Sequence, residues 1–309
     1  MNDLAHPVSH PQRLLPLSPN VSMILFALGA DELVIGRTKY CVSAIENFTT
    51  IWNVPRADVE HRLQYWRTLP DAGAWPAADR DCVVALKADI ILSSGTGPLA
   101  ATDAATFGVA PGALINFDTR TLADLDRQIA TIGELIGKAG AARKLIARLA
   151  ERRAAALVHR KAPHRRPSVL FEYCVCIKYH PDPARRFANP GRFVMAGGHL
   201  APELIQLAGG EPLFTKPGDT VAWTDFNEIK TAEPGILLIF DCNGCPNALK
   251  HPVADRPGRR GLAAFSSQAV FRPRLNIANP NLCYPAALAE LSTFIAEWEQ
   301  LNPEPLTHT

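Results

Sequence analysis

Arg13-Leu-Leu-Pro-Leu-Ser-Pro-Asn-Val-Ser-Met-Ile-Leu-Phe-Ala-Leu-Gly29 is the stretch of sequence that decides the fold. Arg13–Ser18 is predicted as a short apolar strand. A turn follows, and Asn20 or Ser22 caps a helix that Gly29 ends. A strand that passes through a short turn into a helix is typical of α/β proteins.

The same alternation of strands and helices continues downstream. Further strands are predicted at Glu32–Tyr40, Asp89–Ser94, Ala113–Phe117, Ser168–Cys174 and Ile236–Asp241. Helices are predicted at Asp79–Leu86, Leu99–Phe107, Thr121–Lys138, Ala141–His159, Leu200–Leu207, Asp225–Thr231 and Pro285–Leu301. The continuous apolar runs in several of these strands are typical of parallel strands that are buried on both faces.

A break in the pattern divides the chain into two halves. The long, highly charged helix at Ala141–His159 is followed by Lys161-Ala-Pro-His-Arg-Arg-Pro167, which ends it. We therefore expect an α/β protein of two lobes, each with a mainly parallel sheet flanked by helices, joined by one long backbone helix. The expected boundaries are a polar tail at residues 1–12, a lobe at 13–138, the connecting helix at 139–163, a second lobe at 164–303 and a tail at 304–309.

Composition excludes several classes of protein. The 32 basic and 30 acidic side chains leave a net charge of +2, which does not favour nucleic-acid binding. No apolar run is long enough for a membrane-spanning helix, so we expect no membrane insertion. The N-terminal residues are polar and hold no secretory signal, so we expect a cytoplasmic protein, with a periplasmic location as the alternative if a signal has been removed.

Motifs in a fixed order carry a family resemblance. They are Arg13–Gly29, Val34–Cys41, Val84–Leu92, Glu203–Phe214, Ala222–Phe226 and Glu233–Leu238. Over nearly the whole chain this set resembles the class III (helical-backbone) periplasmic binding proteins of ABC importers, most closely the cobalamin-binding-like members. The resemblance implies two α/β lobes that clamp a ligand between them without catalysis. It also implies a monomer that works with an ABC transporter permease if the protein is exported.

Ligands of open parallel sheets bind beyond the carboxyl ends of the strands, and this rule applies without the family. Aromatic side chains in or beside these loops could stack on a flat macrocycle, although packing is the alternative for each. The expected ligand-binding residues are Ser18, Asn20, Tyr40, Trp66, Tyr173, His199, Trp223 and Tyr284. The basic pairs Arg259-Arg260 and Arg272-x-Arg274 are expected on a solvated rim, with contact to a carboxylate or phosphate of a ligand as the alternative.

Six of the seven cysteines fall near the same strand ends, and only Cys82 is expected in a core. Thiolates and imidazoles bind zinc, copper(I) or iron–sulfur clusters, so these residues form a candidate metal site. The candidate metal ligands are Cys41, Cys174, Cys176, His180, Cys242, Cys245 and Cys283. Burial as small apolar side chains is the alternative reading for each cysteine.

Three functional hypotheses follow. The first is a non-catalytic binding protein for a cobalamin-like ligand or an iron or metal chelate. The second is a cytosolic metalloprotein that holds a metal ion or iron–sulfur cluster in a cysteine-rich cleft for storage, delivery or sensing. The third is an enzyme that uses Cys242 or Cys245 as a nucleophile or redox thiol, and no catalytic motif supports it. No resident cofactor is expected with certainty, and the ligand is a small molecule or a metal.

Overall fold

The computed structural model describes residues 11–74, 77–94, 104–158, 166–174, 193–240, 258–275, 277 and 279–302. The chain divides into two compact units. Unit 1 comprises Met1–Thr119, Ala123–Ala150 and Asn281–Cys283. Unit 2 comprises Arg120–Leu122, Glu151–Pro280 and Tyr284–Thr309.

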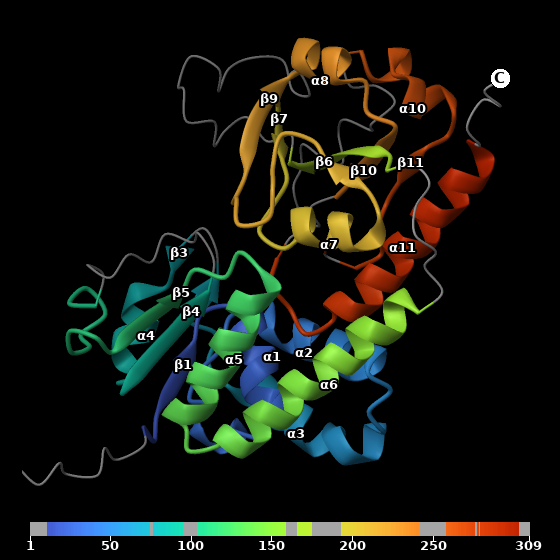
Figure 1. Cartoon of the computed structure of the whole chain (residues 1–309). Helices are drawn as coiled ribbons and strands as arrows, with labels where there is room; N and C mark the ends of the chain where they lie inside the picture. Colours follow the sequence, from blue (N-terminus) through green and yellow to red (C-terminus); the bar gives the residue numbers. More distant parts are fainter. Residues whose placement is uncertain are drawn as a thin grey trace, which may run out of the picture. The chain divides into compact units, whose positions relative to one another are not determined.

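Unit 1 is built on a parallel sheet in the order β1-β4-β5 (Figure 1). The strands are β1 (Leu14–Pro16), β4 (Ile90–Ser94) and β5 (Leu114–Phe117). Leu15 pairs with Ile91, and Ile91 pairs with Leu114, so the three strands run in the same direction at matched levels. Two short strands, β2 (Gly73–Ala74) and β3 (Ala77–Ala78), form a separate antiparallel pair.

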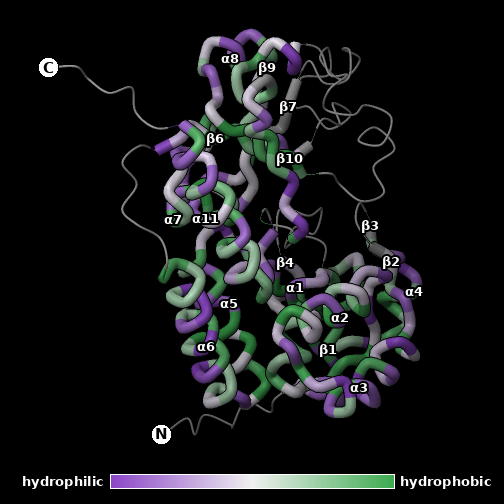
Figure 2. The backbone as a smooth tube through the Cα atoms, turned by 90° about the vertical axis from the view of Figure 1, so that its right-hand side faces the viewer, coloured by the Kyte–Doolittle hydropathy of each residue, from purple (hydrophilic) through white to green (hydrophobic). Residues whose placement is uncertain are grey.

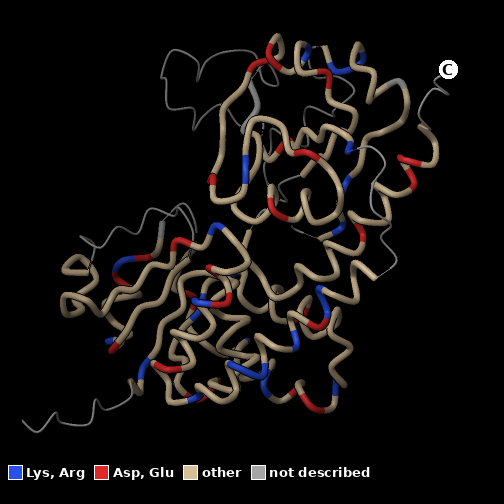
Figure 3. Tube along the Cα trace, in the orientation of Figure 1, with Lys and Arg blue, Asp and Glu red and all other residues tan. Residues whose placement is uncertain are grey.

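Helices surround the sheet of unit 1. They are α1 (Pro19–Ala27), α2 (Cys41–Ile51), α3 (Arg56–Thr68), α4 (Arg80–Ala85), α5 (Leu122–Leu135) and α6 (Ala139–Leu157), with a 3₁₀ turn at Asp31–Leu33. Helix α1 is apolar on nearly every side and packs against α2 and β4. A helix without a polar face is stable only when it is buried, which fixes α1 inside the unit. In contrast, charged residues lie along α3 and α6 (Figure 3).

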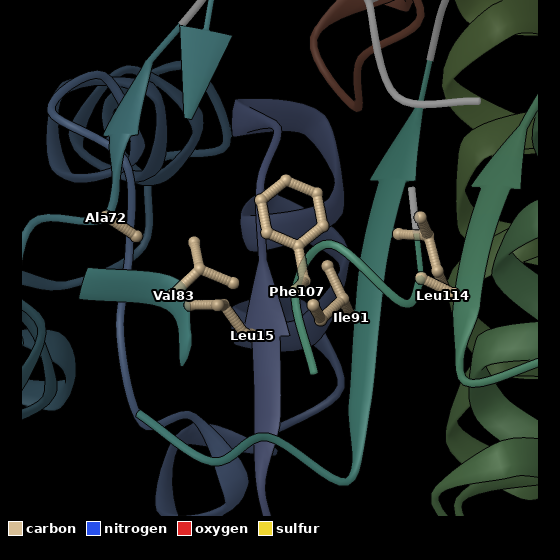
Figure 4. Packing of buried hydrophobic residues seen from close by; sticks show 7 residues of the cluster. Leu15, Ala72, Val83, Ile91, Phe107 and Leu114 are labelled. Atoms are coloured by element: carbon tan, nitrogen blue, oxygen red, sulfur yellow. The ribbon is translucent and has the colours of Figure 1, made fainter. Parts of the chain in front are cut away.

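The hydrophobic core of unit 1 joins all three strands to α4. Leu15, Ile91 and Leu114 come from the strands and Val83 from α4, with Phe107 packed among them (Figure 4). Each of these side chains is at most 7% exposed. Burial of one such side chain contributes about 1.5–3 kcal/mol, so this cluster holds the sheet and its loops in place.

Unit 2 is built on a larger, mixed sheet. Its strands are β6 (Ser168–Cys174), β7 (Phe193–Ala196), β8 (Glu211–Pro212), β9 (Ala222–Asp225), β10 (Ile236–Ile239) and β11 (Val270–Phe271). The order is β11-β10-β6-β7-β9, with β8 also paired to β6. Strands β6, β8, β10 and β11 are parallel, whereas β7 and β9 are antiparallel to their neighbours. The central strands β6 and β10 are mostly hydrophobic (Figure 2).

The helices of unit 2 are α7 (Ala201–Ala208), α8 (Phe226–Ala232), α10 (Ala263–Ser266) and α11 (Tyr284–Leu301), with a 3₁₀ turn at Arg259–Gly261. Helix α7 packs against α11. Helix α8 begins with a complete capping box, in which Asp225 accepts from the first turn and Glu228 accepts from the Asp225 N–H. Gly209 ends α7 in a left-handed conformation.

The structure confirms the predicted α/β class and the parallel central strands, and it corrects several details. Glu32–Tyr40 was expected as a strand, yet it makes only the isolated bridges Leu14↔Val34 and Arg37↔Asp71. Its backbone bonds first to Leu14 and then to Pro70, so neither partner supports a longer ladder. Helices α2 and α3 had not been predicted. Most of the helix predicted at Leu99–Phe107 lies outside the described residues.

Candidate functional site

The carboxyl edge of the unit 1 sheet places Ser18 and Asn20 together. Strand β1 ends at Pro16, and Ser18 is the N-cap residue of α1. The Ser18 hydroxyl donates to Asn20 Oδ1 at 2.9 Å, and it accepts no bond from the helix backbone, which an N-cap side chain usually does. Both side chains are 8% exposed. Asn20 Nδ2 is buried and has no hydrogen-bond partner in the described part of the chain.

The loop before α2 lies beside this first turn of α1. Cys41 Sγ accepts from Ser22 Oγ at 2.9 Å and from the Thr38 N–H at 3.2 Å, which ties the loop to α1. Tyr40 lies in this loop as the N-cap residue of α2 and is 46% exposed. Lys39 Nζ lies 4.9 Å from the centre of the Tyr40 ring. This loop therefore presents an accessible aromatic ring and a cation.

The environment of Cys41 is that of a buried, neutral thiol. Burial raises the pKa of Cys41 above its ordinary value, and the hydrogen bonds from Ser22 and Thr38 offset part of that rise. The thiolate is the metal-binding form, so this environment disfavours metal coordination. The contacts instead hold the loop against α1.

Trp66 had been expected near a ligand, and the structure places it in the core of unit 1. Its ring is completely buried, and its Nε1 donates to Asp31 Oδ1 at 2.6 Å. Arg62 binds the other oxygen of Asp31 at 2.7 Å and also donates to the Phe26 carbonyl at the end of α1. Trp66 thus belongs to a cluster that fixes the end of α1 against α3.

In unit 2 the carboxyl end of β6 carries Tyr173. The Tyr173 ring stacks on Phe240, which follows β10, with the ring centres 5.8 Å apart. Its hydroxyl donates to Asn279 Oδ1 at 3.3 Å. Tyr173 is only partly buried, so this end of the sheet combines an apolar surface with polar groups.

A strained turn places His199 between β7 and α7. Gly197 and Gly198 have φ values of 75° and 143°, and His199 itself has φ 24°. A Cβ on Gly197 would lie 2.5 Å from Thr215 Cγ2, so only glycine fits there. His199 is 6% exposed, and its N–H donates to the Thr220 carbonyl at 3.2 Å. Trp223 lies on β9, opposite Met195, and is partly buried.

A buried ion pair lies on the same sheet of unit 2, and sequence reasoning missed it. Arg259 Nε donates to Glu172 Oε1 at 2.5 Å, and the side chains are 0% and 1% exposed. Arg259 had been expected on a solvated rim, which is wrong. The available signal was Glu172 itself, because it interrupts the apolar strand Ser168-Val-Leu-Phe-Glu-Tyr-Cys174 and a buried carboxylate requires a partner.

The remaining candidates divide between core positions and undescribed ones. Tyr284 is 1% exposed at the start of α11, and Cys283 is 6% exposed. Cys176, His180, Cys242 and Cys245 lie outside the described residues, and the side chain of Cys174 is likewise not described. Within the described ranges no three His, Cys, Asp or Glu side chains come together as a metal site, and Cys41 and Cys82 are free thiols.

Comparison with known proteins gives a clear result for the fold. No family model and no curated protein matches the sequence. Among solved structures, the Fe3+-hydroxamate transport system protein of Saccharomonospora viridis has a TM-score of 0.67 at 19% identity, covering 93% of this chain and 93% of that one.

Two other solved structures carry different ligands in their names. The periplasmic heme-binding protein of Roseiflexus sp. RS-1 has a TM-score of 0.61 at 19% identity and covers 93% of this chain and 98% of that one. The periplasmic vitamin B12 binding protein of Vibrio cholerae has a TM-score of 0.61 at 14% identity, covering 94% and 98%. The chain thus has the fold of these two-lobed binding proteins, as its sequence motifs had implied.

These matches contradict the cytoplasmic expectation. Two of the similar structures are named as periplasmic proteins, which overturns the prediction that rested on the polar N-terminal residues. Burial of Cys41 protects its thiol from oxidation. None of the helices in the described ranges combines the length and apolar character that a membrane span requires.

Proposed function

We propose that this chain, which has the fold of the periplasmic binding proteins of ABC importers, is a non-catalytic binding protein for a compact metal chelate or tetrapyrrole. The observation that carries the proposal is the extent of the structural match. It covers 93–94% of this chain and 93–98% of proteins named for Fe3+-hydroxamate transport, heme and vitamin B12. We further propose that the loaded protein, as a monomer, delivers its ligand to an ABC transporter permease.

The ligand contacts proposed in unit 1 are Ser18, Asn20 and Tyr40. Ser18 and Asn20 lie at the end of β1, where ligands of parallel α/β sheets bind. Tyr40 adds an exposed ring, and the contacts of Cys41 with Ser22 place its loop beside α1. A flat macrocyclic chelate has a π face on which the Tyr40 ring can stack.

The ligand contacts proposed in unit 2 are Tyr173, His199 and Trp223. Tyr173 belongs to the carboxyl end of β6 and stacks on Phe240. His199 lies in a turn that two glycines hold in a strained conformation, and such strain is concentrated at functional sites. Trp66 and Tyr284 are core residues, so they are left out of the proposed site.

The proposal does not include a metal ion bound through Cys41 or Cys283. Cys41 Sγ has hydrogen-bond partners in Ser22 and Thr38, and both thiols are buried. A metal site built mainly from thiolates stays a separate prediction. Its predicted ligands are Cys174, Cys176, His180, Cys242 and Cys245. Measurement of bound zinc, copper and iron in the purified protein tests that prediction in the same preparation as the chelate.

Purification of the protein, followed by a visible spectrum and a thermal melt with added ligand, tests the proposed function. The three probes are hemin, cobalamin and a ferric trihydroxamate. At a free ligand concentration of 100 times Kd, binding to the folded state alone adds about 2.7 kcal/mol of stability. We expect one probe to raise Tm and to co-purify after buffer exchange. A folded protein whose Tm responds to none of the three contradicts the proposal.

A further inference from the structure

The first turn of α1 has backbone donors without acceptors. Pro19, the first helical residue, has no N–H, and the Ser22 N–H donates to the Ser18 carbonyl at 3.2 Å. The N–H groups of Asn20 and Val21 have no acceptor in the described part of the chain. The Ser18 hydroxyl donates to Asn20 Oδ1 and accepts no bond from the helix backbone, so it does not cap them. The N-terminus of this nine-residue helix is therefore uncapped.

The Asn20 side chain adds an independent donor at the same turn. Its Oδ1 lies 2.9 Å from the hydroxyl of the N-cap residue Ser18. Because Nδ2 belongs to the same small planar amide, it lies at the same turn. Nδ2 is buried without a partner in the described chain, while the residue is only 8% exposed. A buried donor without a partner destabilises the folded protein, so an acceptor from a ligand would remove that penalty.

The neighbouring strand contributes a hydroxyl at the same edge. Pro16 pairs with Leu92, and the Leu17 N–H donates to the Leu92 carbonyl at 2.8 Å. Beyond this pair the chain leaves β1 and enters α1 at Ser18, while β4 continues to Ser94, so both residues follow this pair at the carboxyl edge of the sheet. Ser94 Oγ is also buried without a partner in the described residues. The donors of Asn20, Val21 and Ser94 define what we term the α1 donor site.

We propose that the α1 donor site binds a carboxylate group of the transported ligand, an inference that rests on the proposed function. The site offers neutral N–H and O–H donors, and the positive end of the α1 dipole favours an anion there. The first turn of α1 holds no acidic residue. A multiply charged phosphate group is usually met by arginine or lysine, and no basic side chain bonds to Ser18 or Asn20 in the described chain. A singly charged carboxylate is the better match.

Asn20→Asp is the decisive variant. It keeps the shape of the side chain and replaces the donor by a second acceptor that repels a carboxylate. An aspartate in the first helical turn is itself favourable toward the helix dipole, so the variant is expected to fold. Asn227→Asp is the matched control, because Asn227 occupies the same second position of α8, is exposed, and follows an N-cap that Asp225 already satisfies.

The probe is sodium acetate, titrated against sodium chloride at equal ionic strength. The readout is the NMR signals of protein labelled with 15N in asparagine and valine. We expect saturable acetate-specific shifts of the Asn20 side-chain amide and the Asn20 and Val21 backbone signals, in the native protein and in Asn227→Asp. Asn20→Asp should weaken acetate binding, followed at the Val21 backbone signal that both proteins share, about tenfold or more, the effect of a lost charge-assisted hydrogen bond.

The two proposals fail separately. Shifts that are the same with chloride as with acetate, or acetate binding unchanged in Asn20→Asp, overturn the carboxylate site even if a chelate binds. Acetate-specific shifts in a protein that binds no chelate support the carboxylate site and overturn the transport function. If Asn20 has only a structural role, Asn20→Asp lowers stability and leaves the acetate shift of the Val21 backbone signal unchanged, which also contradicts the carboxylate site.

Discussion

Arg259 and Glu172, which are 87 residues apart in the sequence, form an ion pair that water does not reach. Glu172 lies on the central strand β6, and the Arg259 guanidinium also lies 5.6 Å from the centre of the Phe226 ring. A buried charge is costly unless its partner is in place. This pair therefore fixes the chain around Arg259 to the middle of the unit 2 sheet.

Arg259→Met is expected to destabilise the protein strongly, because it leaves the Glu172 carboxylate buried without its partner. The expected loss is about 3–5 kcal/mol in the free energy of unfolding, measured by urea denaturation. The double variant Glu172→Gln with Arg259→Met removes both charges and should recover a large part of that loss.

Arg274→Met provides the control for this prediction. Arg274 binds Glu290 at 3.0 Å, but its side chain is 86% exposed. Exposed pairs contribute about 0–1 kcal/mol, so the control should lose little stability. Equal losses in Arg259→Met and Arg274→Met would contradict the assigned role of the buried pair.

Gly197→Ala should cost more stability than Gly218→Ala. Both glycines have positive φ, 75° and 93°, which costs other residues about 1–2 kcal/mol. Only at Gly197 does an added Cβ also collide, 2.5 Å from Thr215 Cγ2, whereas nothing lies within 4 Å at Gly218. The clash adds about 1–3 kcal/mol, again measured in urea. A Gly197→Ala protein as stable as Gly218→Ala would show that the turn before His199 repacks freely.

Tyr40→Leu should weaken binding of the responsive chelate. Loss of a stacked ring costs about 0.5–1.5 kcal/mol, which corresponds to roughly 2–10-fold in Kd. Tyr65→Leu is the matched control, since Tyr65 is also an exposed tyrosine of unit 1 but lies on α3, with its hydroxyl donating to the Val34 carbonyl. Equal Kd values for the native protein and Tyr40→Leu would exclude Tyr40 from the site.

Cys41 should make stability fall as the pH rises into the alkaline range. Burial raises the pKa of the folded-state thiol, so the folded protein keeps this proton after the unfolded chain has begun to lose it. The contribution is complete below about pH 8.5, the ordinary thiol pKa, and declines above it. Cys41→Ser removes that component from a series of urea titrations at increasing pH. An unchanged pH dependence in Cys41→Ser would contradict the assignment.

Local patterns predicted much of the fold. The apolar run at 89–94 and the strand–turn–helix at 13–29 gave the parallel sheet of unit 1, and the helix predicted at Ala141–His159 is present as α6. Helix α3 was missed because most of its residues are polar. Its buried face, Val59, Leu63 and Trp66, nevertheless recurs at helical spacing, so the signal was in the sequence.

The candidate site residues were harder to predict from the sequence, because their roles depend on contacts between residues that are far apart in the chain. Glu172 stands out in an apolar strand, but nothing local identifies Arg259 as its partner. Cysteine is a residue type that binds metals, so the sequence suggested Cys41 as a ligand. Only its contacts with Ser22 and Thr38 identify it as a buried link between a loop and α1. Ser18 is a usual N-cap residue, and only the structure shows that its hydroxyl donates to Asn20 and accepts no bond from the helix backbone.

An absorbance titration of the purified, ligand-free protein with hemin, cobalamin and a ferric trihydroxamate tests the central claim most directly. The account predicts that one of the three binds saturably, with a one-to-one end point and a Kd of about 1 μM or tighter. A folded protein that shows no saturable spectral change with any of the three would contradict the account.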